Sequence, residues 1–404
     1  MNRRDFENST AGKVIQVGQG NVAYWAFVPN PLPPDLAPEW ELASLLSEAD
    51  RAVSELAGLG RNLPNPDLFV SPFLRREAVL SSRIEGTQSD LTDLYLYEAG
   101  QVPLPGFESI VSPEADVHEV RNYVLALEYG LERLKTLPVS LRLLCEIHER
   151  LLAGVRGEYA TPGCFRTRQN WIGGRTINEA VYVPPPVDEM RAGLDAFEKY
   201  LYVDHPHPPL VRLAFLHYQF EALHPFVDGN GRIGRLLLAL LLVNWQLLPQ
   251  PLLYLSAYFE RNRPDYYAHL LEVSQHGAWR DWVFFFLQGV KEQANDTIWR
   301  IKRLQDLQTL WRGKLDNVRA NATTLRLLEW LFAAPVISIP QAQKLLGVTY
   351  HTARRSVEKL VELDILHQFG ESDYDRRFIA KEILKTLVAE DGTVGYADQN
   401  SGKL

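Results

Sequence analysis

Residues 224–235 place a histidine, a carboxylate, three glycines and two arginines within twelve consecutive positions, in the order H-P-F-V-D-G-N-G-R-I-G-R. This run lies between two apolar segments that we expect to be helical, Leu210–Leu223 and Ile233–Trp245. We therefore predict a loop that leads into the N-terminus of a helix. His224 is the group in this run whose ordinary pKa suits a general base near neutral pH.

The other residues of the run favour an anion and a metal ion. Gly229-Asn230-Gly231 tolerates positive φ, so successive N–H groups can curl around an anion, where the positive end of the helix dipole also lies. Arg232 and Arg235, three residues apart, can both reach that anion. Asp228 offers a hard oxygen to Mg²⁺, which usually binds through one or two carboxylates plus substrate phosphates. Together these residues predict a site for a polyphosphate, a metal and a proton acceptor.

The run resembles the motif of the Fic family, H-P-F-x-D/E-G-N-G-R-x-x-R, and matches every fixed position of it. The alternative is a glycine-rich turn whose histidine only caps a helix. Most Fic proteins transfer AMP from ATP to a hydroxyl group of a target protein, so the resemblance implies a protein adenylyltransferase with ATP as substrate, Mg²⁺ as cofactor and His224 as the base. It assigns nucleotide binding to Asp228, Gly229, Asn230, Gly231, Arg232, Ile233, Gly234 and Arg235, with Asp228 also the metal ligand.

Other reactions of Fic-like proteins stay open. Relatives that resemble phosphotransferases carry a lysine at the second glycine of the loop, whereas this chain has Gly231, which favours nucleotide transfer. Neither the preferred nucleotide, ATP or UTP, nor the target residue is fixed by the motif. Removal of AMP from a target could use the same residues.

A second pattern, S/T-x-x-x-E-G/N, is associated with the same family and occurs here at Ser81–Gly86. We predict a helix over Pro72–Glu85 that Gly86 ends. The resemblance implies an inhibitory helix with Ser81, Glu85 and Gly86 as regulatory residues. Glu85 would pair with Arg235 and occupy the place of the γ-phosphate. The alternative is an ordinary solvated glutamate at a helix end.

Two further segments are assigned by their position in the family pattern. Cys164–Pro186 predicts a β-hairpin flap that would pair with the target backbone, with Val181 and Tyr182 near nucleotide or target. The alternative is a surface hairpin that only packs. Tyr266 and Tyr267 are the choice for the adenine pocket, because an apolar slot lined by aromatic rings suits a purine. Tyr258 and Asn262 are weaker choices, and a tyrosine-rich core helix is the alternative.

The fold class that we predict is mostly α: a helical Fic core with a hairpin flap, plus a C-terminal winged helix-turn-helix domain. Before the motif we expect an irregular arm to Pro38 with a strand-like piece, and helices at Trp40–Leu56, Asp116–Leu134, Leu141–Val155 and Val187–Tyr202. After it we expect a closing helix at Ala278–Gly289 and a connecting helix at Asp296–Leu315. The winged module comprises helices Thr323–Phe332, Ile339–Leu346 and Tyr350–Leu363 and strands Ile365–Phe369 and Arg376–Ala380.

The domain boundaries follow from these segments: an N-terminal arm and helical region at 1–113, the Fic core at 114–290, a linker helix at 291–316, the winged module at 317–389 and a tail at 390–404. From 317 to 389 there are ten Lys or Arg and eight Asp or Glu. That charge balance is barely positive, so the module leaves DNA binding and protein docking both open. The competing function is therefore a nucleotide-sensing transcription regulator.

Composition limits the setting. A formal net charge of −8 argues against a protein that coats nucleic acid or anionic membranes by bulk electrostatics. The two cysteines are too few for a disulfide framework, and the longest apolar run, Leu236–Val243, is far short of a membrane span. We therefore expect a cytoplasmic protein without membrane contact, whose partner is a target protein or itself, with a homodimer left open.

Overall fold

The computed structural model describes residues 1–20, 23–99, 114–155, 160–370 and 376–389, which are mostly helical with two small sheets. The helices are η1 (Arg3–Asp5), α1 (Trp40–Arg61), α2 (Pro66–Ile84), α3 (Leu91–Glu98), α4 (Glu114–Arg133), α5 (Leu141–Leu151), α6 (Val187–Tyr202), α7 (Pro209–Leu223), α8 (Asn230–Asn244), α9 (Ser256–Arg261), α10 (Arg263–His276), α11 (Trp279–Asn317), α12 (Ala322–Leu331), α13 (Ile339–Leu346), α14 (Tyr350–Glu362) and α15 (Lys381–Val388). The strands are β1 (Gly12–Val17), β2 (Tyr24–Pro29), β3 (Val336–Ser338), β4 (His367–Phe369) and β5 (Arg377–Ile379).

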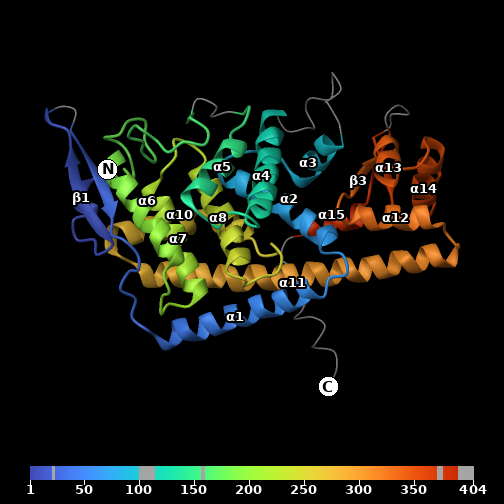
Figure 1. Ribbon diagram of the computed structural model, residues 1–404, viewed down its shortest axis with the longest axis horizontal. Coiled ribbons are helices and arrows are strands. Elements are labelled where there is room, and N and C mark those ends of the chain that lie inside the picture. The colour runs from blue at the N-terminus through green and yellow to red at the C-terminus, as the bar shows by residue number, and fades with distance from the viewer. Residues whose placement is uncertain (21–22, 100–113, 156–159, 371–375, 390–404) are drawn as a thin grey trace.

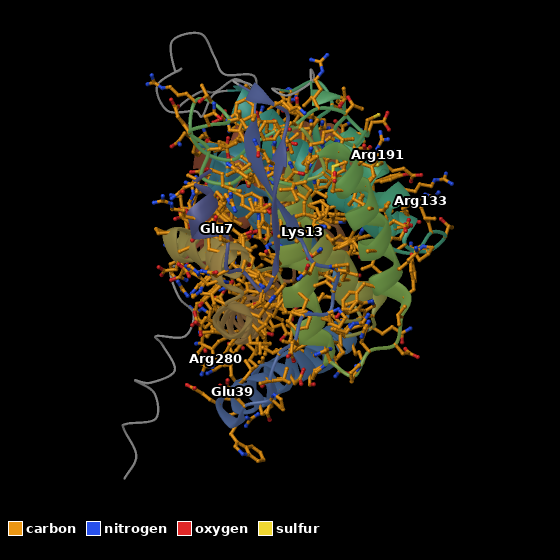
Figure 2. The ribbon with its side chains drawn as sticks, turned by 90° about the vertical axis from the view of Figure 1, so that its left-hand side faces the viewer. Glu7, Lys13, Glu39, Arg133, Arg191 and Arg280 are labelled. Atoms are coloured by element: carbon orange, nitrogen blue, oxygen red, sulfur yellow. The ribbon has the colours of Figure 1, made fainter. Side chains whose placement is uncertain are left out.

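Helix α11, 39 residues long, runs beneath the rest of the molecule, and α1 lies alongside it (Figure 1). The two helices are parallel, since the ion pairs that join them follow both chains in the same order: Arg280–Glu39 at 2.7 Å near their starts, then Lys291–Glu48 at 2.7 Å and Lys302–Glu55 at 3.1 Å. Figure 2 shows the first of these pairs at the edge of the molecule. Exposed pairs stabilise little. The apolar faces beneath them hold the helices together.

The prediction of two separate helices at 278–289 and 296–315 is wrong, because α11 is continuous across both. Gly289 was expected to end the first helix. It lies inside α11 instead, where a Cβ would come 2.6 Å from the ring of Tyr258. Val290 and Ala294 are buried, so the residues that follow continue the apolar face. The expected boundary between core and linker therefore falls within one helix.

Helices α7 and α8 pack against each other and are surrounded by α2, α4, α5, α6, α10 and α11 (Figure 1). Most residues of both helices are buried. A helix that is apolar on all sides needs neighbours all around it, so both helices lie inside the fold. The ends of α7 and α8 therefore have fixed positions.

The N-terminal arm is more regular than expected. Strands β1 and β2 form an antiparallel hairpin, with Val14 opposite Phe27. Phe27 N–H also donates to Val183 O at 2.9 Å, and its ring packs with Phe6 and Tyr182. The arm thus supports the segment that precedes α6.

The predicted two-stranded flap at 164–186 is wrong: within this fully described segment the pairing is one bridge, Ile172 with Tyr182. Gly173 and Gly174 have positive φ, and three prolines follow Val183, so neither side can extend a ladder of hydrogen bonds.

One helix boundary and one additional helix near the start of the chain also differ from expectation. Helix α2 begins at Pro66 rather than Pro72, since Pro66 is at the first helical position, where proline is favoured. Helix α3 was not expected at all. Its N-cap Asp90 forms a capping box with Asp93.

The C-terminal elements α12 to α15 surround a small antiparallel sheet with the strand order β3-β5-β4. The three predicted helices and two predicted strands are confirmed with shifts of a few residues, whereas β3 and α15 were not expected. These elements pack on α2 and α3: Phe332 contacts Phe69, and Arg377 donates to Ala99 O at 2.6 Å. No helix in the described part of the chain is long and apolar enough to cross a bilayer.

Candidate active site

The loop between α7 and α8 begins and ends with residues in the left-handed region. His224 caps α7 with φ of 46°, and its N–H donates to Phe220 O at 3.1 Å. Gly229 caps α8 with φ of 77°. The first bond of α8 runs from Ile233 N–H to Gly229 O at 3.0 Å, so the N–H groups of residues 230–232 point out of the helix N-terminus. An anion is favoured at that end.

The loop carbonyls are held by side chains from the segment between α5 and α6 and from α5 itself. Asn170 Nδ2 donates to Phe226 O at 2.9 Å, and Arg166 Nε donates to His224 O at 2.9 Å. His148 on α5 stacks on the ring of Phe226 at 3.8 Å and contacts Asp228 O through Nε2 at 3.0 Å. Because Gly163 N–H donates to His148 Nδ1 at 3.0 Å, the proton of this histidine is on Nε2.

Asn230 was expected to bind phosphate, but its side chain folds the loop instead. Its Oδ1 accepts from Phe226 N–H at 2.8 Å and its Nδ2 donates to Phe226 O at 2.9 Å. The asparagine is 2% exposed, so any contact with phosphate would come from its backbone N–H. Ile233 is buried, and Gly234 lies against the carboxylate of Glu221, where a side chain would clash.

The imidazole of His224 is suited to accept a proton. Burial lowers its pKa to about 4, an effect that the neighbouring Glu221 carbonyl only partly opposes. The ring is therefore neutral at pH 7, as a general base must be. Arg166 contributes in the same direction, since its positive charge disfavours a second positive charge nearby.

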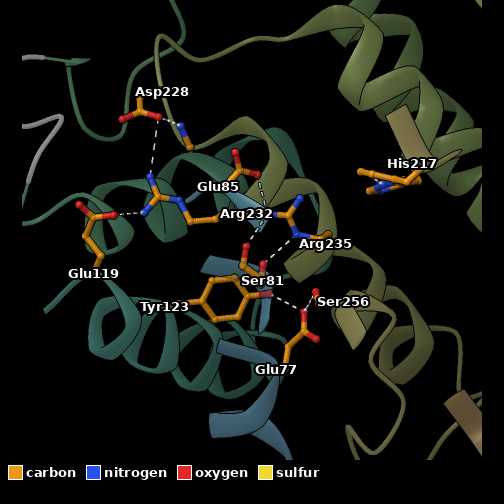
Figure 3. Close-up of polar contacts among 12 residues, drawn as sticks. Glu77, Ser81, Glu85, Glu119, Tyr123, His217, Asp228, Arg232, Arg235 and Ser256 are labelled. Carbon is orange, nitrogen blue, oxygen red and sulfur yellow. Dashed lines mark hydrogen bonds and ion pairs between the residues drawn. The ribbon is translucent and has the colours of Figure 1, made fainter. Parts of the chain in front are cut away.

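Arg235 pairs with the residues that the second sequence pattern contributes (Figure 3). Its Nη2 donates to Glu85 Oε1 at 2.7 Å and to Ser81 O at 3.0 Å, and its Nε donates to Ser81 Oγ at 2.8 Å. Arg235 is 2% exposed and Glu85 is 35% exposed. Burial alone would raise the pKa of Glu85, but the charge of Arg235 lowers it below the ordinary value. The expected contact between Glu85 and Arg235 is thus present.

Two glycines make this contact sterically feasible. Gly86 follows α2 with φ of 106°, a conformation that ends the helix at Ile84 and leaves Glu85 as its C-cap. A Cβ at Gly231 would collide with Glu85 Oε1 and come 2.9 Å from Arg235 Nη1. The glycine therefore admits the carboxylate to the helix N-terminus.

Arg232 faces the opposite way, toward α4 and the loop (Figure 3). Its Nη1 donates to Glu119 Oε2 at 3.2 Å, and its Nη2 lies 3.7 Å from Asp228 Oδ1. The side chain of Asp228 is 49% exposed, and Oδ1 accepts from Gly229 N–H at 2.6 Å.

This donor set fits Mg²⁺ in its usual manner, with one accessible carboxylate and the remaining ligands from phosphates and water. Among the described residues no group of three or more His, Cys, Asp or Glu could hold a metal alone.

A buried polar cluster lies one turn below Ser81 on α2 (Figure 3). Glu77 is 2% exposed and its Oε1 accepts from Ser256 Oγ at 2.5 Å and from Tyr123 O–H at 3.0 Å. Burial raises the pKa of Glu77 to about 7. This carboxyl group ties α2 to α4 and α9, and so fixes the helix that carries Glu85.

The aromatic candidates divide into core and surface. Tyr266 is 1% exposed and its hydroxyl is 2.8 Å from His217 Nε2, whereas Tyr267 is 44% exposed and its ring lies 5.2 Å from that of Tyr266. Tyr258 is buried against Phe285, and Asn262 bonds to Tyr258 O within its own turn. Of these residues, Tyr267 offers the accessible ring.

The two flap candidates also differ. Tyr182 is 6% exposed and its hydroxyl donates to Ala222 O at 2.9 Å, so its ring belongs to the core. Val181 is 53% exposed, with the neighbouring Trp171 41% exposed.

Sequence reasoning missed the residues that support the site from a distance: His148, Arg166, Asn170, Glu119 and Glu77. They lie 46 to 179 positions away from the loop or helix residues that they contact in the site, and nothing in their local pattern indicates a polar contact in a buried place.

Two family profiles match this chain: "Fic/DOC family N-terminal" over residues 43–132 and "Fic/DOC family" over residues 138–242. A protein adenylyltransferase Fic of Drosophila persimilis is 28% identical over 185 residues, 45% of this chain and 33% of that protein. The relative of the same name from Drosophila virilis is 29% identical over 185 residues, 45% of this chain and 35% of that protein. The chain thus covers about a third of the length of these curated relatives.

Solved structures agree in fold. A Fic family protein from Desulfovibrio desulfuricans G20 superimposes with a TM-score of 0.54 at 20% identity, covering 86% of this chain and 98% of that one. A Fic domain containing signaling protein from Bacteroides thetaiotaomicron gives a TM-score of 0.50 at 18% identity, covering 63% and 95%. With the complete motif at the start of α8 and both profiles in place, this chain belongs to the Fic/DOC family.

Proposed function

We propose that this protein is a protein adenylyltransferase that transfers AMP from ATP to a serine, threonine or tyrosine hydroxyl of a target protein or of itself. The observation that carries this proposal is the imidazole of His224, whose pKa is lowered to about 4, beside the N-terminus of α8. A base and an anion site lie next to each other, as nucleotidyl transfer requires.

In the proposed reaction His224 takes the proton of the target hydroxyl as its oxygen attacks the α-phosphorus of ATP. One P–O bond forms to the target, the bond from the α-phosphorus to the bridging oxygen breaks, and pyrophosphate leaves. The N–H groups of residues 230–232 and Arg232 would hold the α- and β-phosphates. Mg²⁺ would be held by Asp228 and would offset the phosphate charge when bound. Tyr267 would cover the adenine.

Glu85 would inhibit this reaction by occupying Arg235. A γ-phosphate placed at Arg235 would meet the carboxylate 2.7 Å from the guanidinium, and two anions cannot share that position. ATP would then bind with its α-phosphorus turned away from His224. Since Glu85 is partly exposed at a helix end, it can be displaced without opening the core.

Labelling with α-³²P-ATP tests the proposal. Glu85→Gly should transfer label to itself or to a lysate protein, and Glu85→Gly with His224→Ala should not, because removal of a general base costs roughly 10²–10⁴-fold. Parallel reactions with UTP and CTP identify the preferred nucleotide, and intact mass identifies the transferred group. Absence of label from all three nucleotides with Glu85→Gly would exclude nucleotide transfer.

A second candidate, a DNA-binding regulator, has support from the C-terminal elements. Helix α14 begins at the N-cap Thr349 and exposes Tyr350, His351, Arg354 and Arg355 on its first turns, as a recognition helix of a winged module would. A gel shift with DNA from upstream of its own gene tests this candidate. Arg355→Ala should weaken a specific shift, and an equal shift with both proteins would exclude α14 as the reading helix.

A further inference from the structure

Arg166 is the largest buried charge near the catalytic loop that the proposed reaction does not use. It is 0% exposed, and its partners among the described residues are backbone carbonyls rather than a carboxylate. Nε donates to His224 O at 2.9 Å, and Nη2 donates to Leu223 O at 3.5 Å and to Pro185 O. Nη1 donates to Arg168 O at 3.3 Å.

The backbone of Arg166 adds to the same contact, since its N–H donates to Pro225 O at 2.9 Å. One residue therefore engages the carbonyls of three successive residues, 223 to 225, at the end of α7. Asn170, four residues later, completes the set by donating to Phe226 O at 2.9 Å and to His224 O at 3.4 Å.

Burying a charge without a carboxylate partner costs free energy, so we expect this arrangement to have a function that offsets the cost. His224 is a non-glycine residue with φ of 46°, a conformation that persists only where its surroundings over-determine it. The guanidinium can do so because its rigid fork reaches carbonyls on both the flap segment and α7 at once. A point charge such as an ammonium group would satisfy fewer of them.

We propose that Arg166, assisted by Asn170, is a positioning residue that holds the backbone of His224 in its left-handed conformation and so aims the imidazole at the reacting hydroxyl. The inference rests on the proposed function for the identity of the reaction, but the geometry that it assigns is a property of the free protein. The two residues touch neither the anion site at α8 nor Arg235 in any contact that the structure describes.

The test compares Arg166→Lys and Asn170→Ala in a Glu85→Gly background with a matched control, Arg300→Lys. Arg300 is likewise buried and donates to backbone carbonyls, those of Thr386 and Ala389, far from the site. For each variant we would measure kcat and KM for transfer, ATP affinity by calorimetry, melting temperature and the NMR signals of the His224 ring.

Arg166→Lys should lower kcat by roughly 10- to 100-fold, since misplacement of a catalytic group by about 1 Å costs on that order. ATP affinity should stay within about threefold, because the phosphates bind elsewhere. Asn170→Ala should lower kcat several-fold, and its ATP affinity should likewise stay nearly unchanged. If Arg166→Lys fails to fold, the Asn170→Ala variant alone still tests the proposal. Arg300→Lys should lower the melting temperature and leave kcat unchanged.

An unchanged kcat in the Arg166 and Asn170 variants would overturn the proposal, as would a parallel loss of kcat and ATP affinity. Failure of the proposed function gives a different result: the Glu85→Gly parent itself transfers no label. In that case the His224 ring signals still decide. They should shift in Arg166→Lys and Asn170→Ala and not in Arg300→Lys, and unshifted signals would exclude the positioning role.

Discussion

Two buried arginines near helix α2 each bind a carboxylate and a backbone carbonyl, but the two carboxylates differ in their exposure to solvent. Arg235 is 2% exposed and bonds to Glu85 and Ser81 O, and Arg300 is 1% exposed and bonds to Asp296 and the Ala389 carbonyl. Glu85, however, comes from another element, lies just past a helix end and is 35% exposed. Asp296 is 8% exposed, is one turn from Arg300 in the same helix, and binds it through both oxygens at 2.8 Å.

The difference shows that an ion pair can either stabilise the fold or regulate a site. Asp296 also lies 3.6 Å from Arg76 of α2, so its removal would leave two arginines without that partner. The carboxylate of Glu85 can be exchanged for another anion that arrives from solvent. Exposure and origin of the carboxylate, rather than the distance to the arginine, therefore distinguish the two pairs.

The largest effect should come from breaking the pair between Arg300 and Asp296. Arg300→Met should lower the free energy of unfolding by about 3–5 kcal/mol, since it removes the guanidinium that binds both oxygens of the buried Asp296 carboxylate. Urea unfolding followed by circular dichroism measures this loss. Transfer per folded molecule should not change. A stability loss below about 1 kcal/mol would mean that the two pairs are equivalent.

The next effect concerns Glu77, which lies on α2 between the two pairs. Its folded pKa of about 7 exceeds the ordinary value of about 4.3, so folding favours the protonated form. The stabilisation is complete below about pH 4 and is lost as the pH rises through about 7, by about 4 kcal/mol in total.

Glu77→Gln should remove this part of the pH dependence, because the amide stays neutral and still bonds to Ser256 and Tyr123. Urea unfolding of both proteins between pH 4 and pH 8 measures it. Parallel curves for the two proteins would show that folding does not raise the pKa of Glu77.

Breaking the pair between Glu85 and Arg235 should have a smaller effect in free energy, which should appear as a change in the rate of AMP transfer. Glu85→Gly should raise AMP transfer by roughly 10- to 100-fold, or about 1.4–2.7 kcal/mol of barrier, and Arg235→Ala added to it should abolish that gain. The matched control is Glu98→Gly. Glu98 also ends a helix and pairs with a partly buried arginine, Arg75, at 2.7 Å. Equal rates in wild type and Glu85→Gly would contradict inhibition by this contact.

The smallest effect should come from the exposed carboxylate at the loop. Asp228→Ala should raise the Mg²⁺ concentration for half-maximal transfer by roughly fivefold, about 1 kcal/mol, because phosphates and water remain as ligands. Asp195→Ala on α6 is the control, an exposed aspartate paired with Lys199. An unchanged Mg²⁺ titration would remove Asp228 from the metal site.

The chemistry of the site was largely predictable because it is contained in local runs. His224, Asp228, Arg232 and Arg235 fall within one loop and one helical turn, so their proximity follows from the chain itself. The pair between Glu85 and Arg235 spans 150 positions and was predicted from a resemblance, not from the physics of either segment.

What the sequence did not predict depends on distant packing. The side chain of Asn230 turns to Phe226 rather than outward because the loop carbonyl and N–H need partners once the loop is buried. The paired strands expected at 164–186 fail because alternation in a sequence does not reveal that Arg166 and Val183 bond elsewhere. Short strands such as β3 have too few residues to give a pattern.

The continuity of α11 has a consequence for how the molecule unfolds. At about 1.5 Å per residue the helix extends for about 58 Å, from the wall of the catalytic region to the C-terminal elements. Its first half packs along α1, and its second half, through Arg300, holds the end of α15. Loss of either half would expose apolar surface in the other, so the catalytic region and the C-terminal elements share one cooperative transition rather than melting as separable modules.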